Sequence, residues 1–370
     1  MRAVLAALLL GFAAWRSLPS LTLLASTLRG VGFPDCAQDY LGARALLAGG
    51  PLYPALGEAG RALGIESAVN HASTHLPTAY LLALPVAALP WPLAYPLWLA
   101  LMWICMALAA RLYGLPWRLA LLIAALALLW PPALWSLAQL TPVWLLGLAL
   151  AWHYRERPAL AGAAVVLAAL PKGFAALGLA PFLLRRQTPA LLGAAAVGLL
   201  ALALLLALRP SALAEYMSAN AGESLRQMGR PDNGALLPAL WQWAGWPGLL
   251  PGAALVLTVL WRSLSPAPEA QAWAGWTWLG VALLPIAWVY SLLPLAPWLL
   301  WRLGNGSPLG RISAALALLA PLLSPIPGAG GPPVGVLLCL VLSALAISPT
   351  WRSDNRSHSA SPHSPGCCRK

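Results

Sequence analysis

The sequence predicts an all-α integral membrane protein, on the basis of its composition, its succession of apolar segments and its distribution of charge. Sixty per cent of the 370 residues are hydrophobic and nine per cent are charged, far outside the range of soluble globular domains. Apolar segments follow one another from near the N-terminus to about residue 348. The net charge of +12 comes from Lys and Arg scattered singly or in pairs between these segments, which is typical of cytoplasmic loops and not of a nucleic-acid-binding surface.

The predicted membrane domain covers residues 1–348. Its start, MRAVLAALLLGFAAW, is similar to a signal peptide, but no cleavage site precedes a soluble mature chain, so we expect a retained first helix. Residues 349–370 lack the apolar residues needed for folding, which predicts a disordered cytoplasmic tail. The five cysteines form no C-x-x-C pair and no metal-ligand spacing, so we expect no redox or metal site and no cofactor.

The first apolar segment, residues 3–28, is expected to lead the chain to the outer face, where a polar loop extends to about residue 75. Within that loop, residues 36–48 have apolar positions at helical spacing and are followed by the stop signal Gly49, Gly50 and Pro51. This pattern predicts an extracytoplasmic amphipathic helix that lies on the membrane surface.

The remaining apolar segments predict a polytopic bundle of about ten to twelve transmembrane helices, several shorter than the roughly 20 residues of a straight span. A short piece at 77–89 is expected to be re-entrant or interfacial, and a full-length span follows at 93–110. Further spans are expected at 117–136, 142–153, 158–171, 174–184, 189–208, 246–261, 271–290, 293–301, 311–324 and 333–348.

The basic residues between the spans predict the orientation. Short Arg-containing loops are retained in the cytoplasm, which places the polar loops at 32–75 and 209–245 together on the extracytoplasmic side. We therefore expect a multi-pass protein of the cell membrane whose site faces outward. Many of the twenty tryptophans lie near the ends of predicted spans and are interpreted as interfacial anchors.

Asp35 and Asp39 are the first candidates for chemistry. They lie four residues apart at the start of the predicted surface helix, so their carboxylates share a face. One of them can act as a general base while the other orients or tunes it. An exposed helix start is the alternative, because the helix dipole favours acids there.

Three segments, in this order, resemble one protein family. They are D-x-x-x-D-Y-x-x-A-R-A-L-L-A-G-G-x-L-Y from Asp35, H-L-P-T-A-Y-L-L-A-L-P-V-A-A-L-P from His75 to Pro90, and L-A-A-L-P-K-G-F-A-A-L around Lys172. The chain from about residue 30 to 300 resembles the polyprenol-phosphate-mannose-dependent α-mannosyltransferases of glycosyltransferase family 87. The resemblance implies a GT-C-like bundle.

By position, the resemblance implies that Asp35 is the general base on the acceptor hydroxyl and that Tyr40 binds substrate. Asp39 replaces an aromatic residue of the family, which leaves open which carboxylate is the base, with Asp35 favoured. Lys172, a lone cation after Pro171 in a long apolar run, is expected to meet the donor phosphate. The alternative is a lysine that extends to the outer interface.

Gln139, in Ala-Gln-Leu-Thr, resembles a Gly-Gln-x-Asn turn of the family and is expected to contact substrate. Trp288 and Tyr290 are similar to a Ser-Pro-x-Ser-Trp-x-His pattern in which Tyr290 stands in place of His. Tyrosine can donate a hydrogen bond to a phosphate or sugar, but it is not a cation near neutral pH, so donor binding is expected to differ.

Two further pairs have helical spacing. Arg226 and Arg230 can clamp a phosphate, although ordinary loop charges explain them equally well. His71 and His75 have the spacing of a metal pair, but His75 is expected to contact substrate instead, because Pro77 limits the helix that would align them.

These residues predict a membrane glycosyltransferase that moves a sugar, expected to be mannose, from a polyprenyl-phosphate donor to a lipid or glycan hydroxyl at the extracytoplasmic face. A Gly-rich phosphate loop and a D-x-D sequence, typical of nucleotide-dependent enzymes, are absent from the sequence. The alternatives are a transporter or flippase of lipid-linked or hydrophobic solutes and an inactive relative that binds a lipid carrier. Predicted span interiors are nearly free of carboxylates, which favours the enzyme over the transporter.

Overall fold

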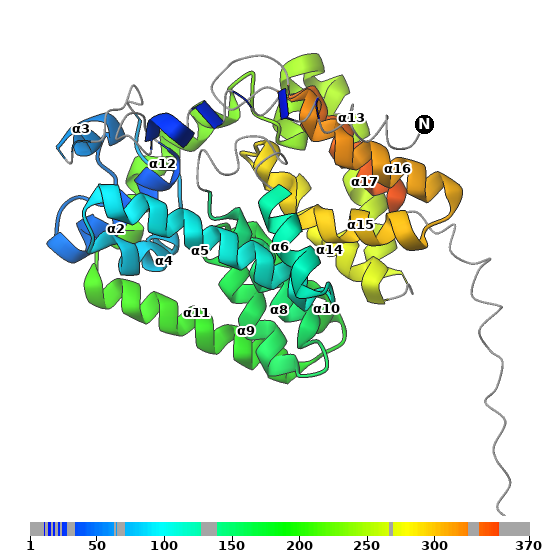
Figure 1. Ribbon diagram of the computed structural model, residues 1–370, viewed down its shortest axis with the longest axis horizontal. Helices are drawn as coiled ribbons and strands as arrows, with labels where there is room; N and C mark the ends of the chain where they lie inside the picture. Colours follow the sequence, from blue (N-terminus) through cyan, green and yellow to red (C-terminus); the bar gives the residue numbers. More distant parts are fainter. Residues whose placement is uncertain are drawn as a thin grey trace, which may run out of the picture.

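The structure is a computed structural model that describes residues 11, 14, 15, 18, 21, 22, 24–27, 34–62, 64, 71–126, 139–265, 269–324 and 333–347. Most of the predicted first helix, the end of the predicted span at 117–136 and the predicted tail at 349–370 lie outside these residues. Within the described ranges the chain forms helices joined by turns, with no β-strand, so the all-α prediction is confirmed (Figure 1).

Three helices in the described part of the chain are long and apolar enough to cross a membrane, namely α5 (Trp91–Leu112), α11 (Thr188–Leu208) and α13 (Leu236–Leu264). The other helices are α2 (Cys36–Ala48), α3 (Leu56–Arg61), α4 (Pro77–Ala87), α6 (Trp117–Leu126), α8 (Thr141–His153), α9 (Pro158–Ala169), α10 (Ala180–Leu184), α12 (Ala212–Met228), α14 (Glu269–Ala282), α15 (Ala296–Asn305), α16 (Pro308–Leu319) and α17 (Val334–Ala346), with the 3-10 helices η1 (Gly173–Leu179), η2 (Val289–Leu295) and η3 (Ala320–Leu323). Several of them are short apolar helices, as the sequence predicts.

Two predicted boundaries differ from the structure. The span expected at 271–290 ends at Ala282, where an irregular segment containing Pro285 leads to η2. The loop expected at 209–245 contains the helix α12 and the start of α13. Residues 212–228 are rich in Ala, Leu, Glu and Met, which are strong helix formers. The segment is too polar to be recognised as a helix when only apolar spans are considered.

Helix α2 forms at the predicted residues and ends at Gly49, which adopts a left-handed conformation with φ 78° and donates its N–H to the Ala45 carbonyl. The sequence predicts one exposed polar face, whereas the structure buries α2 on nearly every side. Helix α4 packs so tightly against it that a Cβ atom at Gly42 would lie 2.6 Å from the Tyr80 ring. The carboxylate of Asp39 is therefore enclosed by protein.

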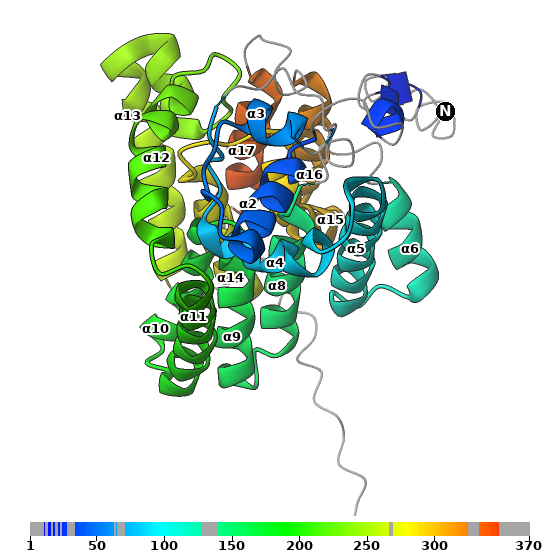
Figure 2. The same cartoon turned by 90° about the vertical axis from the view of Figure 1, so that its left-hand side faces the viewer.

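Small residues bring α8, α9 and α11 into close contact. A Cβ atom at Gly162 of α9 would lie 1.9 Å from the Ala190 carbonyl oxygen of α11, and one at Gly193 would lie 2.0 Å from the Ala159 carbonyl oxygen. Such glycines let helix backbones approach each other where apolar burial alone drives association weakly. Figure 2 shows these helices side by side below α2 and α4.

The two polar segments predicted to share one side of the membrane lie against each other. The Leu52 N–H donates to Glu215 Oε2 of α12 over 3.0 Å, and the Tyr53 and Tyr216 rings lie 5.8 Å apart. Helices α2, α3 and α12 therefore form one end of the molecule (Figures 1 and 2). A cavity in the described structure borders this end, because residues of α2, α3 and α12 line it.

Candidate functional site

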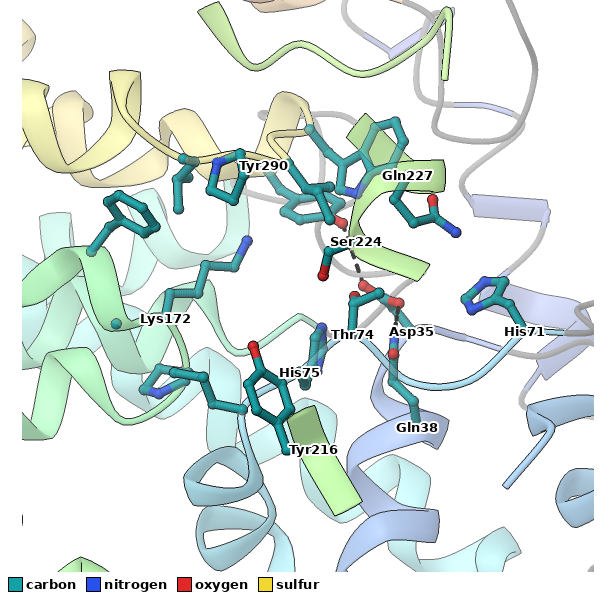
Figure 3. Close-up of a pocket in the computed structure, with 18 of the residues that line it drawn as sticks. Asp35, Gln38, His71, Thr74, His75, Lys172, Tyr216, Ser224, Gln227 and Tyr290 are labelled. Atoms are coloured by element: carbon teal, nitrogen blue, oxygen red, sulfur yellow. Dashed lines mark hydrogen bonds between the residues drawn. The ribbon is translucent and has the colours of Figure 1, made fainter. Parts of the chain in front are cut away.

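The cavity has a volume of about 790 Å³, which is within the range of small-molecule sites. Its polar wall comes from the start of α2, the segment before α4, Lys172 and helix α12, and its apolar wall from segments 173–177 and 284–288. The residues that line it are Asp35, Gln38, Leu56, His71, Thr74, His75, Leu76, Pro171, Lys172, Gly173, Phe174, Ala176, Leu177, Tyr216, Ser224, Gln227, Arg230, Leu284, Pro285, Ile286, Trp288 and Tyr290. Figure 3 shows the polar side chains around one space.

Asp35 is the carboxylate on the cavity wall. It follows Pro34 and precedes the first residue of α2, where its side chain makes no capping bond to the helix backbone. Asp35 Oδ2 accepts a hydrogen bond from the Tyr290 hydroxyl over 3.3 Å, and Oδ1 accepts one from the Gln38 side-chain amide (Figure 3). The carboxylate is thus held by two donors from different parts of the chain and still borders open space.

Gln38 and Ser73 connect this carboxylate to the segment before α4. The Ser73 hydroxyl donates to Gln38 Oε1 over 3.0 Å and accepts the His75 backbone N–H over 3.2 Å. Neither residue is a candidate from the sequence, because a single Gln or Ser has no distinctive pattern. Their role depends on a contact between residues 35 positions apart.

Asp39 occupies a different environment from Asp35. It is 0% exposed, its Oδ1 accepts a hydrogen bond from His75 Nδ1 over 2.7 Å, and its Oδ2 has no partner among the described residues. Burial raises the pKa of the Asp39 carboxyl, although the His75 imidazolium opposes this. Burial is also the largest single effect on His75 and opposes the imidazolium, but the charge and hydrogen bond of Asp39 and the charge of Asp35 together outweigh it and raise the pKa of His75.

Lys172 lies in an extended conformation between α9 and η1, and its side chain crosses toward the opposite wall (Figure 3). Its Nζ donates to the Ser291 hydroxyl over 3.3 Å and lies 5.5 Å from the centre of the Tyr290 ring. No carboxylate of the described chain lies within ion-pair distance of this ammonium group. Burial lowers the pKa of Lys172 to about 8, against the attraction of Asp35 and Asp39.

The structure separates the predicted arginine pair. Arg230 lines the cavity, where Asp232 accepts two hydrogen bonds from its guanidinium over 2.9 and 2.8 Å and the Trp288 ring lies 5.0 Å away. Arg226 is exposed, pairs with Glu223 and does not line the cavity. Of the two, only Arg230 borders the space in which a ligand would lie.

Tyr40 and Gln139 also lie away from the cavity wall. The Tyr40 hydroxyl donates to the Leu89 carbonyl over 2.8 Å, so it ties α2 to the end of α4. Gln139 is 2% exposed, and its side-chain amide has no partner in the described structure. Trp288 and Tyr290, in contrast, line the cavity.

The predicted histidine pair makes two separate contacts. His71 Nδ1 lies 3.8 Å from Glu223 Oε1, whereas His75 pairs with Asp39. Within the described residues, no group of three or more His, Cys, Asp or Glu side chains could hold a metal ion. Both histidines border the cavity, so both can contact a ligand there.

Asn233 fixes the wall that contains Trp288 and Tyr290. Its side chain is buried, donates to the Met228 and Pro285 carbonyls over 3.3 and 3.1 Å, and accepts the N–H groups of Ala235 and Ala287 over 3.0 Å each. One amide thus joins the turn after α12 to the segment before η2. Sequence reasoning missed this residue because its partners are as many as 54 positions away.

The arrangement combines a carboxylate, a half-buried ammonium group with no carboxylate partner among the described residues, a carboxylate-bound imidazole and an apolar wall around one cavity. No curated protein and no solved structure matches the chain. The family model of glycosyltransferase family 87 matches residues 74–325, which is more than half of the 370 residues. The match includes every residue that lines the cavity except Asp35, Gln38, Leu56 and His71. The chain therefore belongs to glycosyltransferase family 87, a family of membrane glycosyltransferases.

Proposed function

We propose that the protein transfers a sugar, mannose by resemblance, from a polyprenyl-phosphate donor to a hydroxyl of a lipid or glycan acceptor. The bundle is of the GT-C type, crosses the membrane several times and opens its cavity to the extracytoplasmic side. Asp35 is the general base. The observation that most supports this reaction is the position of Asp35 and Lys172 on the wall of one cavity.

Asp35 is a better base than Asp39 because it borders the space that an acceptor can enter. A general base must lie within hydrogen-bond reach of the proton that it removes. Asp39 is fully buried and already bound to His75, so an acceptor hydroxyl would have to displace protein to reach it. The Tyr290 and Gln38 donors orient the Asp35 carboxylate, which leaves Asp39 a supporting role.

The donor is a lipid phosphate because the cavity offers both a cation and an apolar wall. Lys172 has no carboxylate partner among the described residues, and a buried cation is costly unless an anion meets it. Phe174, Leu177 and Ile286 provide apolar surface beside it for the start of a hydrocarbon chain. A transporter has less support than a transferase, because the chain belongs to a glycosyltransferase family.

The test is a membrane assay with radiolabelled polyprenyl-phosphate-mannose and extracted lipid acceptors. We expect Asp35→Asn to reduce turnover by about 100-fold or more, the scale of general-base effects, while the donor still binds. The control is Glu58→Gln, which makes the same change at an exposed carboxylate of α3. An Asp35→Asn enzyme as active as Glu58→Gln would refute Asp35 as the base, and wild-type turnover with another polyprenyl-phosphate sugar alone would refute mannose.

A further inference from the structure

The contact between Asp39 and His75 has no place in the reaction above. Asp39 is 0% exposed, and its one hydrogen-bond partner in the described structure is His75 Nδ1, at 2.7 Å. A buried carboxylate with an oxygen left unpaired destabilises the fold unless its partner is charged. Asp39 therefore holds the His75 imidazolium at a fixed position on the cavity wall, and burial of this carboxylate lowers the stability of the fold.

In the described structure, one contact orients the ring of His75 and two more fix its backbone. Asp39 binds Nδ1, and Ser73 Oγ accepts the His75 backbone N–H, while the Tyr53 hydroxyl donates to the His75 carbonyl over 3.1 Å. Nε2 is then the ring nitrogen without a partner in the described structure, and His75 lines the cavity. An imidazolium in this position presents one N–H to a ligand.

The charged groups around His75 come from several elements. Asp39 and Asp35 of the α2 region favour its protonation, and Lys172 from the α9–η1 turn opposes it. Tyr216 of α12 lines the same space as a neutral phenol. With His75 protonated, Asp35 and Asp39 balance His75 and Lys172, and Asp232 balances Arg230, which also lines the cavity, so these charges sum to about zero.

The proposed transfer changes this balance. The bond between the sugar carbon and the phosphate oxygen breaks and leaves its electron pair on that oxygen, while the acceptor oxygen bonds to the same carbon and its proton moves to Asp35. A phosphodiester with one negative charge becomes a phosphate monoester with a second negative charge. Donors that strengthen their contact as this charge develops accelerate the reaction.

We propose that His75 is a catalytic residue whose imidazolium Nε2–H contacts the leaving phosphate oxygen, and that Asp39 is the positioning residue that keeps His75 charged and oriented. This role rests on the proposed function. It assigns Lys172 to the charge already present on the donor and His75 to the charge that develops during transfer. It also gives Asp39 a task that an aromatic residue at this position does not perform.

The first test measures turnover against pH. The imidazolium is lost as pH rises through its pKa, so wild-type activity should fall on the alkaline side, and His75→Gln should lower kcat by about 100-fold with a smaller change in donor KM. Asp39→Asn keeps the shape of the side chain but removes its charge, so the alkaline fall should move to lower pH. At pH values above the pKa of His75, each unit of that shift lowers the protonated fraction of His75 about tenfold.

Lys172 also loses its proton near pH 8, and the Asp39 charge also attracts its ammonium group. A double-mutant cycle therefore separates the effect of Asp39 on His75 from its effect on Lys172. If Asp39 acts through His75, Asp39→Asn should change nothing further in a His75→Gln background. A second effect of equal size in that background would assign the Asp39 charge to Lys172 and overturn the proposal. Activity that rises with pH and disappears in His75→Gln would make His75 a base and overturn it as well.

The second test measures binding without turnover. Farnesyl phosphate serves as a lipid monophosphate probe and farnesol as its uncharged counterpart, with intrinsic tryptophan fluorescence as the signal. His75→Gln should weaken the binding of farnesyl phosphate about tenfold, the scale of one charged hydrogen bond, and leave the binding of farnesol unchanged. His153→Gln, at an exposed histidine at the end of α8, is the matched control.

The outcomes of the binding test distinguish the two proposals. Equal binding by His75→Gln, His153→Gln and wild type would show that the Asp39 pair is structural only. Weaker farnesyl phosphate binding in His75→Gln, together with no wild-type turnover on any polyprenyl-phosphate sugar, would support the anion contact and refute the proposed reaction. If His75→Gln does not fold, the isosteric Asp39→Asn should weaken farnesyl phosphate binding more at pH 8 than at pH 6, and equal weakening at both would overturn the role of His75.

Discussion

At the scale of single residues, the site contains groups that stability alone would not select. In the described structure, the Lys172 ammonium group has one hydrogen-bond partner, a hydroxyl. One carboxylate oxygen of Asp39 has no hydrogen-bond partner there. The lowered pKa of Lys172, about 8, means that the unfolded chain holds this proton more tightly than the folded protein. Stability should therefore rise between about pH 8 and pH 10.5 as the unfolded chain loses its advantage.

Lys172→Met tests whether this lysine sacrifices stability for donor binding. The thioether has a similar length without a charge to desolvate, so we expect the Tm in detergent at pH 7 to equal or exceed that of the wild type. Use of the lipid-phosphate donor should fall strongly. A lower Tm together with unchanged donor KM would mean that Lys172 supports the fold and does not bind the donor.

Lys172→Arg tests the charge itself. In the wild type, donor KM should rise as pH passes about 8, because the ammonium group loses its proton there. A guanidinium stays protonated, so KM in Lys172→Arg should remain nearly constant from pH 7 to pH 9, although its different shape lowers overall activity. Parallel KM profiles for the two proteins would assign the alkaline effect to another group.

At the scale of elements, the site depends on contacts that fix one segment against another. The Asn233 side chain joins the turn after α12 to residues 285–287, directly before Trp288 and Tyr290. The glycines of α9 and α11 set the spacing of the helices that lead to Lys172. In both cases a single small or polar side chain determines where a whole segment lies.

Asn233→Leu replaces four hydrogen bonds by an apolar group of similar size. It leaves two backbone N–H groups and two carbonyls without this partner, so we expect a loss of about 3 kcal/mol or more of unfolding free energy. Because the 285–290 wall loosens, donor KM should rise in the fraction that still folds. Asn305→Leu, which changes an exposed amide at the end of α15, should lower the Tm far less. Similar Tm values for the two variants would contradict the proposed constraint.

Two glycines of α11 form a matched pair. Alanine is the better helix former by about 1 kcal/mol, so Gly198→Ala, whose new Cβ would meet Val166 at 3.8 Å, should leave the Tm equal or higher. Gly193→Ala would place its Cβ 2.0 Å from the Ala159 carbonyl oxygen and should destabilise by about 1–3 kcal/mol as α9 moves away. Thermal unfolding in detergent distinguishes them, and equal Tm values would show that α9 and α11 are less tightly packed than described.

At the scale of the whole molecule, the proposed function predicts that the cavity faces the extracytoplasmic side of the membrane. Helix α3 lies at the end formed by α2 and α12, and Glu58 is an exposed residue on it. Glu156 is exposed in the turn between α8 and α9, among arginines expected to lie in the cytoplasm. We therefore expect these two positions to lie on opposite sides of the membrane.

Cysteine labelling in intact cells checks this orientation. In a background where Cys105, Cys367 and Cys368 are serine, Glu58→Cys should react with an impermeant maleimide, and Glu156→Cys should react only after permeabilisation. Cys36 and Cys339 are buried and should not react with the maleimide. The reverse pattern would place the cavity on the cytoplasmic side and would exclude the proposed orientation.

The fold class and most helices are predictable from the sequence because hydropathy and helix formation are local properties. The helix at 36–48 and its stop at Gly49 follow from a few consecutive residues. The distinct environments of Asp35 and Asp39 are not predictable in this way, because their spacing on α2 does not reveal that His75, 36 positions away, binds only one of them. Gln38, Ser73 and Asn233 escape notice for the same reason, since their partners lie far away in the chain.

The position of Lys172 and His75 on one wall has a consequence for the end of the catalytic cycle. Through their direct contacts, these two cations should hold the spent carrier, a phosphate monoester with two negative charges, more strongly than the incoming donor with its single charge. We therefore expect lipid monophosphates to inhibit the enzyme as products that compete with the donor. Higher ionic strength should relieve the inhibition only slightly, since charges in a partly enclosed cavity are poorly screened.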